Sequence, residues 1–167
     1  LSPRFPAYQA ASAIIMGQLR RLSPLVEPLS LDEAYVDLEA GEHADLSDDG
    51  VRVIATALKE AVHEATGLTV SVGAGCSKLT AKIASDLDKP DGLLVVTAGQ
   101  ERDILRSLAV TRIPGVGPAT ATRLRSIGVT SVAELADLDE SEAIGLLGAN
   151  HGRGLWQLAQ GLDDRPV

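Results

Sequence analysis

The chain has 167 residues, of which 45% are hydrophobic and only 2% aromatic. This length and this hydrophobic content allow one sizeable domain or two small ones with an aliphatic core, and they exclude an extensively disordered chain. The formal net charge of −8 argues against nucleic-acid binding over the whole surface, and the single cysteine, Cys76, excludes an internal disulfide framework.

No apolar run approaches the length of a membrane span, and no signal-peptide pattern opens the sequence. A lone cysteine is also typical of a reducing compartment. We therefore expect a cytoplasmic protein that has no membrane partner.

The first hundred residues alternate between helical and strand patterns. Gly67 is expected to end the second helix, because glycine tolerates the left-handed conformation found there. The order of the elements predicts the α+β class, with helices on one face of a mostly antiparallel sheet. In chain order we expect a helix over 7–22, strands over 25–29 and 33–38, a helix over 50–65, a strand over 68–75, a helix over 77–88 and a strand over 93–96.

After about residue 98 only helical patterns remain. Glycine, proline or Asp/Ser signals separate these short helices from one another. We therefore expect a first domain over 1–98 and a small all-α domain over 99–167. The helices are expected near 99–108, 118–127, 131–136, 139–146 and 150–161.

The most specific local motif is IPGVGPATATRLRSIGV, residues 113–129. A Gly-Val-Gly turn leads into a helix that starts near Pro118, and proline is favoured at a first helical position. Unpaired amides at such a start, together with Arg123 and Arg125, can bind one phosphate. The pattern is similar to a helix–hairpin–helix motif, which holds the DNA backbone without reading bases, and an ordinary tight turn between helices is the weaker alternative.

Two adjacent carboxylates, Asp32 and Glu33, stand at the junction of the first two expected strands. Side chains of neighbouring strand residues point to opposite faces, so these two can converge only where the backbone bends. Mg²⁺ prefers carboxylate oxygens. Taken alone, the local pattern fits a solvated turn and a metal site equally well.

Three lysines follow on or near the helix over 77–88. Lys78 and Lys82 lie one turn apart, and Lys89 opens a Lys-Pro-Asp-Gly turn just before a strand. A lysine in that turn can be aimed at the sheet face that carries Asp32, where it would meet a triphosphate.

Three segments, in this order and at these distances, resemble a Y-family translesion DNA polymerase of the bacterial polymerase IV type. They are SLDEAYVDL (30–38), SVGAGCSKLTAKIASDLDKPDGLLVV (71–96) and the hairpin motif over 113–129. The segment RFPAYQAAS (4–12) also resembles the helix that leads into the catalytic strands of that family. The resemblance covers nearly the whole chain.

The resemblance implies a palm-like domain over 1–98, with the last residues of the fingers region, and a thumb with a helix–hairpin–helix over 99–167. Template-directed addition of nucleotides to a primer 3′-hydroxyl would use two Mg²⁺ ions. Asp32 would be shared by both ions, Glu33 would complete the ion that activates the 3′-hydroxyl, and Lys89 would contact the deoxynucleoside triphosphate. The expected contacts to primer–template DNA are Gly115, Val116, Gly117, Ala119 and Arg123.

The sequence also departs from the pattern of the family. The first metal-binding aspartate, most of the fingers and the little-finger domain have no counterpart here, so we expect the fragment to be inactive alone. A sliding clamp is a further candidate partner, through C-terminal parts outside this sequence. Two alternatives stay open: a non-catalytic helix–hairpin–helix module that binds DNA, and, with less support, a nucleotide cyclase of similar layout.

Overall fold

The computed structural model describes residues 4–167. These residues form two compact units, which are described separately. The first comprises the chain up to Ala74 with Ala84–Val95 and Pro166–Val167, and the second comprises Gly75–Ile83 and Val96–Arg165. The first three residues of the domain expected over 1–98 lie outside the described residues.

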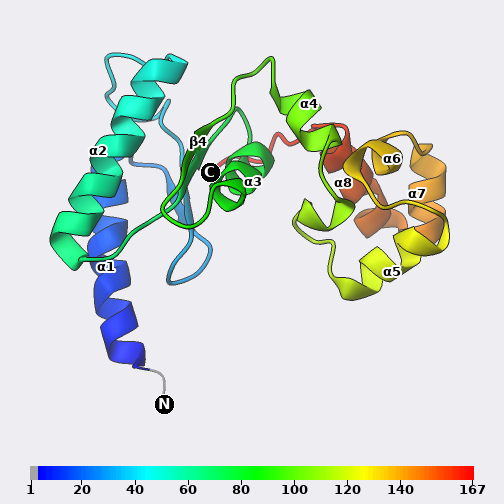
Figure 1. Ribbon diagram of the computed structural model, residues 1–167, viewed down its shortest axis with the longest axis horizontal. Helices are drawn as coiled ribbons and strands as arrows, with labels where there is room; N and C mark the ends of the chain where they lie inside the picture. The colour runs from blue at the N-terminus through cyan, green and yellow to red at the C-terminus, as the bar shows by residue number, and fades with distance from the viewer. Residues whose placement is uncertain (1–3) are drawn as a thin grey trace. The chain divides into compact units, whose positions relative to one another are not determined.

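Two long helices form the helical layer of the first unit. Helices α1 (Phe5–Leu22) and α2 (Asp48–Thr66) pack side by side (Figure 1). Helix α2 begins after Ser47, whose Oγ accepts a hydrogen bond from the Gly50 amide at 3.2 Å. It ends at Gly67, which has the left-handed φ of 70° predicted from the sequence.

The strands of the first unit form two separate pairs. Strands β1 (Val26–Pro28) and β2 (Ala34–Val36) are antiparallel, with Val26 opposite Val36 and Pro28 opposite Ala34. Strands β3 (Val72–Ala74) and β4 (Leu93–Val95) are parallel, with Val72 opposite Leu93.

The expected α+β class is confirmed, but the expectation of one mostly antiparallel sheet is wrong in detail for the residues described. The reason lies in the connections. A short turn joins β1 to β2 and permits antiparallel pairing, whereas helix α3 (Lys78–Leu87) joins β3 to β4 as a crossover, which gives a parallel pair. All four strands have three residues each, which is shorter than the sequence suggested.

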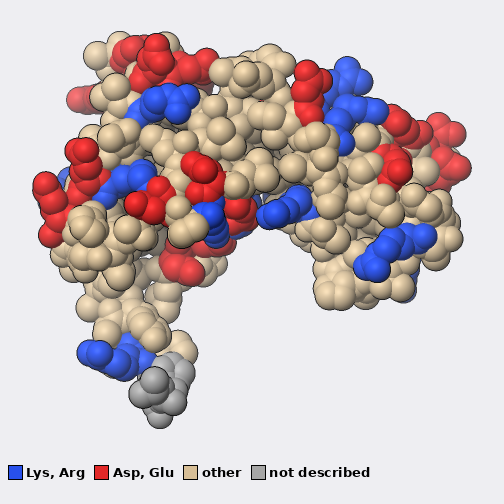
Figure 2. Space-filling view, in the orientation of Figure 1, with Lys and Arg blue, Asp and Glu red and all other residues tan. Residues whose placement is uncertain are grey.

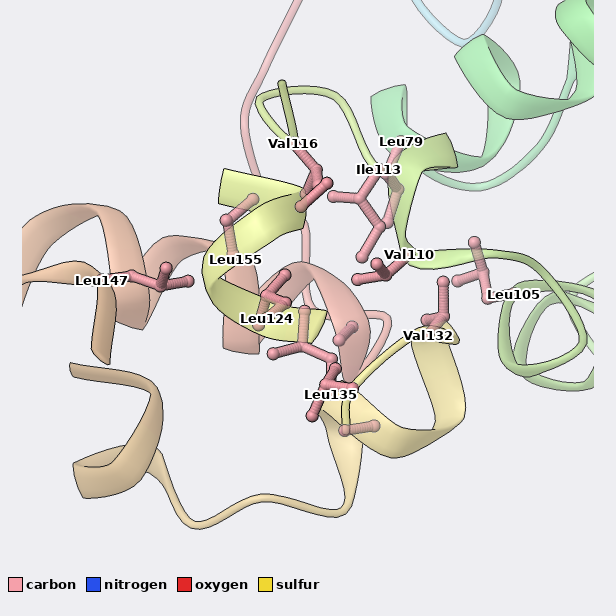
Figure 3. Close-up of a cluster of buried hydrophobic side chains, with 14 of the residues drawn as sticks. Leu79, Leu105, Val110, Ile113, Val116, Leu124, Val132, Leu135, Leu147 and Leu155 are labelled. Carbon is pink, nitrogen blue, oxygen red and sulfur yellow. The ribbon is translucent and has the colours of Figure 1, made fainter. Parts of the chain in front are cut away.

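The second unit is helical apart from one isolated bridge between Ala109 and Ser131. Its core contains the side chains of Leu79, Ile113, Leu124 and Leu135, each at most 1% exposed (Figure 3). Besides the start of α3, its elements are α4 (Glu101–Arg106), the 3₁₀ helix η1 (Val110–Arg112), α5 (Pro118–Ser126), α6 (Val132–Ala136), α7 (Glu140–Leu147) and α8 (Ala149–Ala159).

Helices α7 and α8 approach each other closely at Gly152. A Cβ atom built on this glycine would lie 2.3 Å from the carbonyl oxygen of Ala143, so only glycine fits. Gly148, with a φ of 93°, makes the turn between the two helices. Within residues 4–167, no helix is both long and apolar enough to cross a membrane.

Candidate active site and nucleic-acid interface

Asp32 and Glu33 lie in the turn of the β1–β2 hairpin, as their position in the sequence predicted. The amides of Leu29 and Ser30 both donate to the carbonyl oxygen of Glu33, at 2.8 and 3.2 Å, and this bends the chain. Ser30 Oγ donates to Asp32 Oδ1 at 2.6 Å. The hydroxyl of Ser30 therefore orients a carboxylate that is otherwise exposed to solvent.

The two carboxylates supply the hard oxygen donors that Mg²⁺ prefers. Asp32 is exposed and Glu33 is half-buried. Across the described residues 4–167, however, no three His, Cys, Asp or Glu side chains come together in a group that could hold a metal ion. The residues present thus fit part of a two-metal site, which normally takes further carboxylates and substrate oxygens.

Lys89 lies in the turn between α3 and β4. Its Nζ is 2.6 Å from Asp86 Oδ1, one helical turn back, and its side chain is half-exposed at 51%. Asp86 is half-buried, and a partly exposed ion pair of this spacing contributes only about 0.5 kcal/mol. The ammonium can therefore exchange Asp86 for a more highly charged anion at little cost.

A half-buried lysine that the sequence analysis missed, Lys59, forms hydrogen bonds to the same turn. Lys59, on α2, donates from Nζ to the carbonyl oxygens of Val70, Asp91 and Gly92 at 2.6, 2.8 and 3.3 Å. Its side chain is only 17% exposed. In the sequence Lys59 is one more charged position on an amphipathic helix, and no local signal shows that it faces a distant loop.

The hairpin before α5 has the backbone geometry expected of it. Gly115 has a φ of 98°, a conformation that favours glycine. Gly117 is the N-cap of α5 with Pro118 at the first helical position, and no side chain among the described residues caps this helix. The first-turn amides, that of Ala119 included, therefore lack partners within the helix and are placed to meet an anion.

The predicted hairpin residues differ in exposure. Gly115, Gly117, Ala119 and Arg123 are exposed, whereas the side chain of Val116 is buried in the core of the second unit (Figure 3). Val116 also donates its amide to the carbonyl oxygen of Ile113 at 3.0 Å. Its side chain therefore stabilises the hairpin from within and does not face a ligand.

Charge on the surface is mixed. On the face drawn in Figure 2, acidic and basic side chains are interspersed and do not form one continuous basic field. Local basic character comes from the segment Arg106–Arg125, which contains four arginines and no acidic residue. One of the four, Arg106, is engaged by Asp137 at 2.9 Å. Screening limits the reach of the remaining negative charge to about 10 Å.

Comparison with known families decides the identity of the fold. Residues 1–86 match the impB/mucB/samB family, and residues 107–149 match the SAM-like helix-hairpin-helix tandem. The chain belongs to the impB/mucB/samB family. The second match includes the Gly115–Gly117 hairpin and ends at Ala149, just after the turn between α7 and α8.

Curated relatives of this impB/mucB/samB chain align along its whole length. DNA polymerase IV of Streptomyces coelicolor is 49% identical over 167 residues, and those of Alkalilimnicola ehrlichii and Corynebacterium diphtheriae are 44% and 42% identical. The alignments cover 100% of this chain but 35%, 46% and 37% of the respective relatives. The chain thus spans less than half the length of the relatives that it matches.

Solved structures show the same fold. A DinB family error-prone DNA polymerase from Sulfolobus solfataricus superposes with a TM-score of 0.91 at 30% identity, over 100% of this chain and 50% of the other. The insertion ternary complex of Dbh DNA polymerase gives 0.88 at 31% identity, over 98% and 47%. The resemblance to Y-family polymerases that the sequence motifs indicated is therefore confirmed.

Proposed function

We propose that this chain is the palm and thumb of a template-directed translesion DNA polymerase, with the palm over 1–98 and the thumb over 99–167. One observation carries the proposal. The alignment with DNA polymerase IV sequences runs through the whole chain at up to 49% identity, so it includes both the hairpin with the paired carboxylates and the helix–hairpin–helix. The substrates would be primer–template DNA and deoxynucleoside triphosphates.

Asp32 and Glu33 would hold Mg²⁺ in this polymerase. Their place in a bent hairpin turn supports this role, because a bend lets adjacent carboxylates approach a common ion. Bound there, Mg²⁺ would stabilise the charge that develops on the oxygens of the transferred phosphoryl group. Ser30, which donates to Asp32 at 2.6 Å, would keep the carboxylate oriented.

Lys89 would bind the triphosphate of the incoming nucleotide. Its present partner is the half-buried carboxylate of Asp86, and a triphosphate offers a higher negative charge. Lys59 supports this role indirectly, because its hydrogen bonds to Val70, Asp91 and Gly92 restrain the turn that contains Lys89.

The helix–hairpin–helix would bind the DNA backbone. Exposed first-turn amides of α5 would donate to a phosphate, and Arg123 would add positive charge one turn further along the helix. Contacts of this kind position a duplex without reading its sequence, which suits an enzyme that copies any template.

Further parts of the polymerase would complete the active centre. The described residues bring fewer than three metal-ligating carboxylates together, so we expect chain 1–167 alone to be inactive. A sliding clamp is a further proposed partner, engaged through parts of the polymerase outside this chain.

Primer extension tests the proposal. The full-length polymerase should extend a primer with Mg²⁺ and four deoxynucleoside triphosphates, and its Asp32→Ala variant should not. Asp49→Ala, an exposed carboxylate in the first turn of α2, is the matched control and should retain activity. Equal primer extension by the Asp32→Ala variant would show that the two carboxylates belong to a solvated turn and not to a metal site. DNA binding without extension by either protein would favour a non-catalytic helix–hairpin–helix module.

A further inference from the structure

The start of helix α3 is held by acidic residues from distant parts of the second unit. The amide of Leu79 donates to Asp163 Oδ2 at 2.8 Å, across 84 positions of sequence. The amide of Cys76, just before the helix, donates to Glu101 Oε1 at 3.1 Å. Negative charge is favourable at this end of a helix, because the peptide dipoles make it positive.

The contact from Asp163 is specific, because its side chain is almost completely enclosed. The side chain of Asp163 is 1% exposed, and that of its partner Arg165 is 54% exposed. Arg165 donates from Nε to Oδ1 at 2.5 Å and from Nη2 to Oδ2 at 2.8 Å. Both carboxylate oxygens are thereby hydrogen-bonded, which an enclosed charge requires.

The hydrogen bonds to this carboxylate favour its charged form. Hydrogen bonds from Arg165 lower the pKa of Asp163 below its ordinary value, and the amide of Leu79 acts in the same direction. Asp163 is therefore an anion under physiological conditions, facing the positive end of α3.

Leu79 is fixed through its side chain as well as its backbone. The side chain is 0% exposed and belongs to the same buried cluster as Ile113 of the hairpin (Figure 3). The local cap, Ser77 Oγ, accepts only the amide of Thr80, at 3.2 Å. Without Asp163, the amide of Leu79 would lose the acceptor that the structure gives it.

We propose that Asp163, oriented by Arg165, is a positioning residue that sets the start and direction of α3. This helix carries Lys78 and Lys82 and leads directly into the turn with Lys89. The helix is continuous over ten residues, so we expect a loosened first turn to affect the turn that follows its last residue. The consequence for nucleotide binding rests on the function proposed above, whereas the anchoring of α3 does not.

Amide hydrogen exchange of chain 1–167 tests the anchoring. In Asp163→Ala the protection of the Leu79 amide should fall by about tenfold to a hundredfold, as expected for loss of a hydrogen bond to a charged group. In Asp163→Asn an acceptor remains, so the protection of the Leu79 amide should fall less. Asp164→Asn, at the exposed neighbouring residue, is the matched control and should leave this protection unchanged. Unchanged protection in Asp163→Ala would overturn the proposal. Should that variant fail to fold, protection in Asp163→Asn equal to that in Asp164→Asn would overturn it instead.

Steady-state kinetics of the full-length polymerase test the functional part. Asp163→Asn should raise KM for the nucleotide several-fold while kcat changes little, because Lys89 is misplaced before the nucleotide binds. A merely structural defect would lower the fraction of active enzyme and hence kcat, with KM unchanged, and that result would overturn the positioning role. If primer extension by the full-length polymerase does not depend on Asp32, the proposed function is wrong. The hydrogen-exchange experiment still tests the anchoring of α3 independently.

Discussion

The Nζ atom of Lys59 lies 2.5 Å from Oδ1 of Asp91, 32 positions further along the chain. The same ammonium donates to three backbone carbonyl oxygens, of Val70, Asp91 and Gly92. One side chain of α2 is therefore hydrogen-bonded both to the segment before β3 and to the turn before β4. The two strands pair over only three residues, so these hydrogen bonds add a connection between α2 and the segments that precede them.

Replacing Lys59 by methionine should destabilise the protein. Methionine keeps most of the apolar stem but removes every hydrogen bond of the ammonium, and hydrogen bonds to a charged group contribute about 1.5–3 kcal/mol. We expect the free energy of unfolding, measured by urea denaturation, to fall by about 2 kcal/mol. Arg52→Met, at an exposed position of the same helix, should change the free energy of unfolding little. An equal decrease in both variants would contradict a stabilising role for the hydrogen bonds of Lys59.

Two glycines of α8 should respond oppositely to alanine. At Gly152 the new methyl group would meet the carbonyl oxygen of Ala143, so we expect a loss of about 1–3 kcal/mol from forced separation of α7 and α8. At Gly154 a Cβ atom would meet nothing within 4 Å, so alanine should stabilise the helix by about 0.5–1 kcal/mol. Thermal unfolding of both variants measures the difference, and a gain at Gly152 would show that the two helices are not in close contact.

Glu134 should make stability depend on pH in the acid range. Its carboxylate accepts hydrogen bonds from the amides of Thr130 and Ser131 and from Thr130 Oγ1, at 2.7–2.9 Å. The amide of Thr130 is the main cause that lowers the pKa of Glu134 from 4.5 to about 2. A depressed pKa stabilises the fold above the unfolded value, so this contribution is present above pH 4.5 and is lost as the pH falls toward 2.

Glu134→Gln tests this contribution by chemical denaturation at several pH values. The variant should be less stable than the wild type at neutral pH, and the difference should narrow as the pH falls below 4.5. Glu39→Gln, at an exposed glutamate, serves as the control, and its stability should equal that of the wild type at every pH. A difference that stays constant down to pH 2 would mean that the hydrogen-bonded carboxylate does not titrate as stated.

Arg123 should contribute to DNA affinity without contributing to sequence preference. In the full-length polymerase, Arg123→Ala should weaken binding to different duplexes equally and reduce the slope of log K against log salt by about 1, as for loss of one phosphate contact. Arg102→Ala, at an exposed arginine of α4, is the matched control. Salt titrations of affinity measure both slopes, and identical slopes for wild type and Arg123→Ala would exclude Arg123 from the interface.

The sequence predicted the helices well because their signals are local. The apolar period of 3.6 residues marked α1 and α2, Gly67 marked the end of α2, and Pro118 marked the start of α5, all as observed. The strand expected over 68–75 is observed only at Val72–Ala74. A strand extends only as far as its partner does, and the partner is set by distant residues.

The candidate site was predictable where adjacent residues define it. Asp32 and Glu33 were placed at the junction of two strand patterns, and Gly115 and Gly117 at the helix start by turn chemistry, while their roles in catalysis and DNA binding stay predictions. The bond between Asp163 and Leu79 had no such signal. Its partners are 84 positions apart and meet only because the helical core folds between them.

Single-turnover incorporation of one nucleotide by the full-length polymerase tests the central claim most directly. Asp32→Asn keeps the shape of the side chain and removes its charge, so we predict unchanged affinity for primer–template DNA and a rate lowered by at least about a hundredfold, as for loss of a group that stabilises the transition state. Asp49→Asn should match the wild type in both measurements. An incorporation rate for Asp32→Asn equal to that of the wild type would contradict the assignment of this hairpin as the metal-binding part of a polymerase active site.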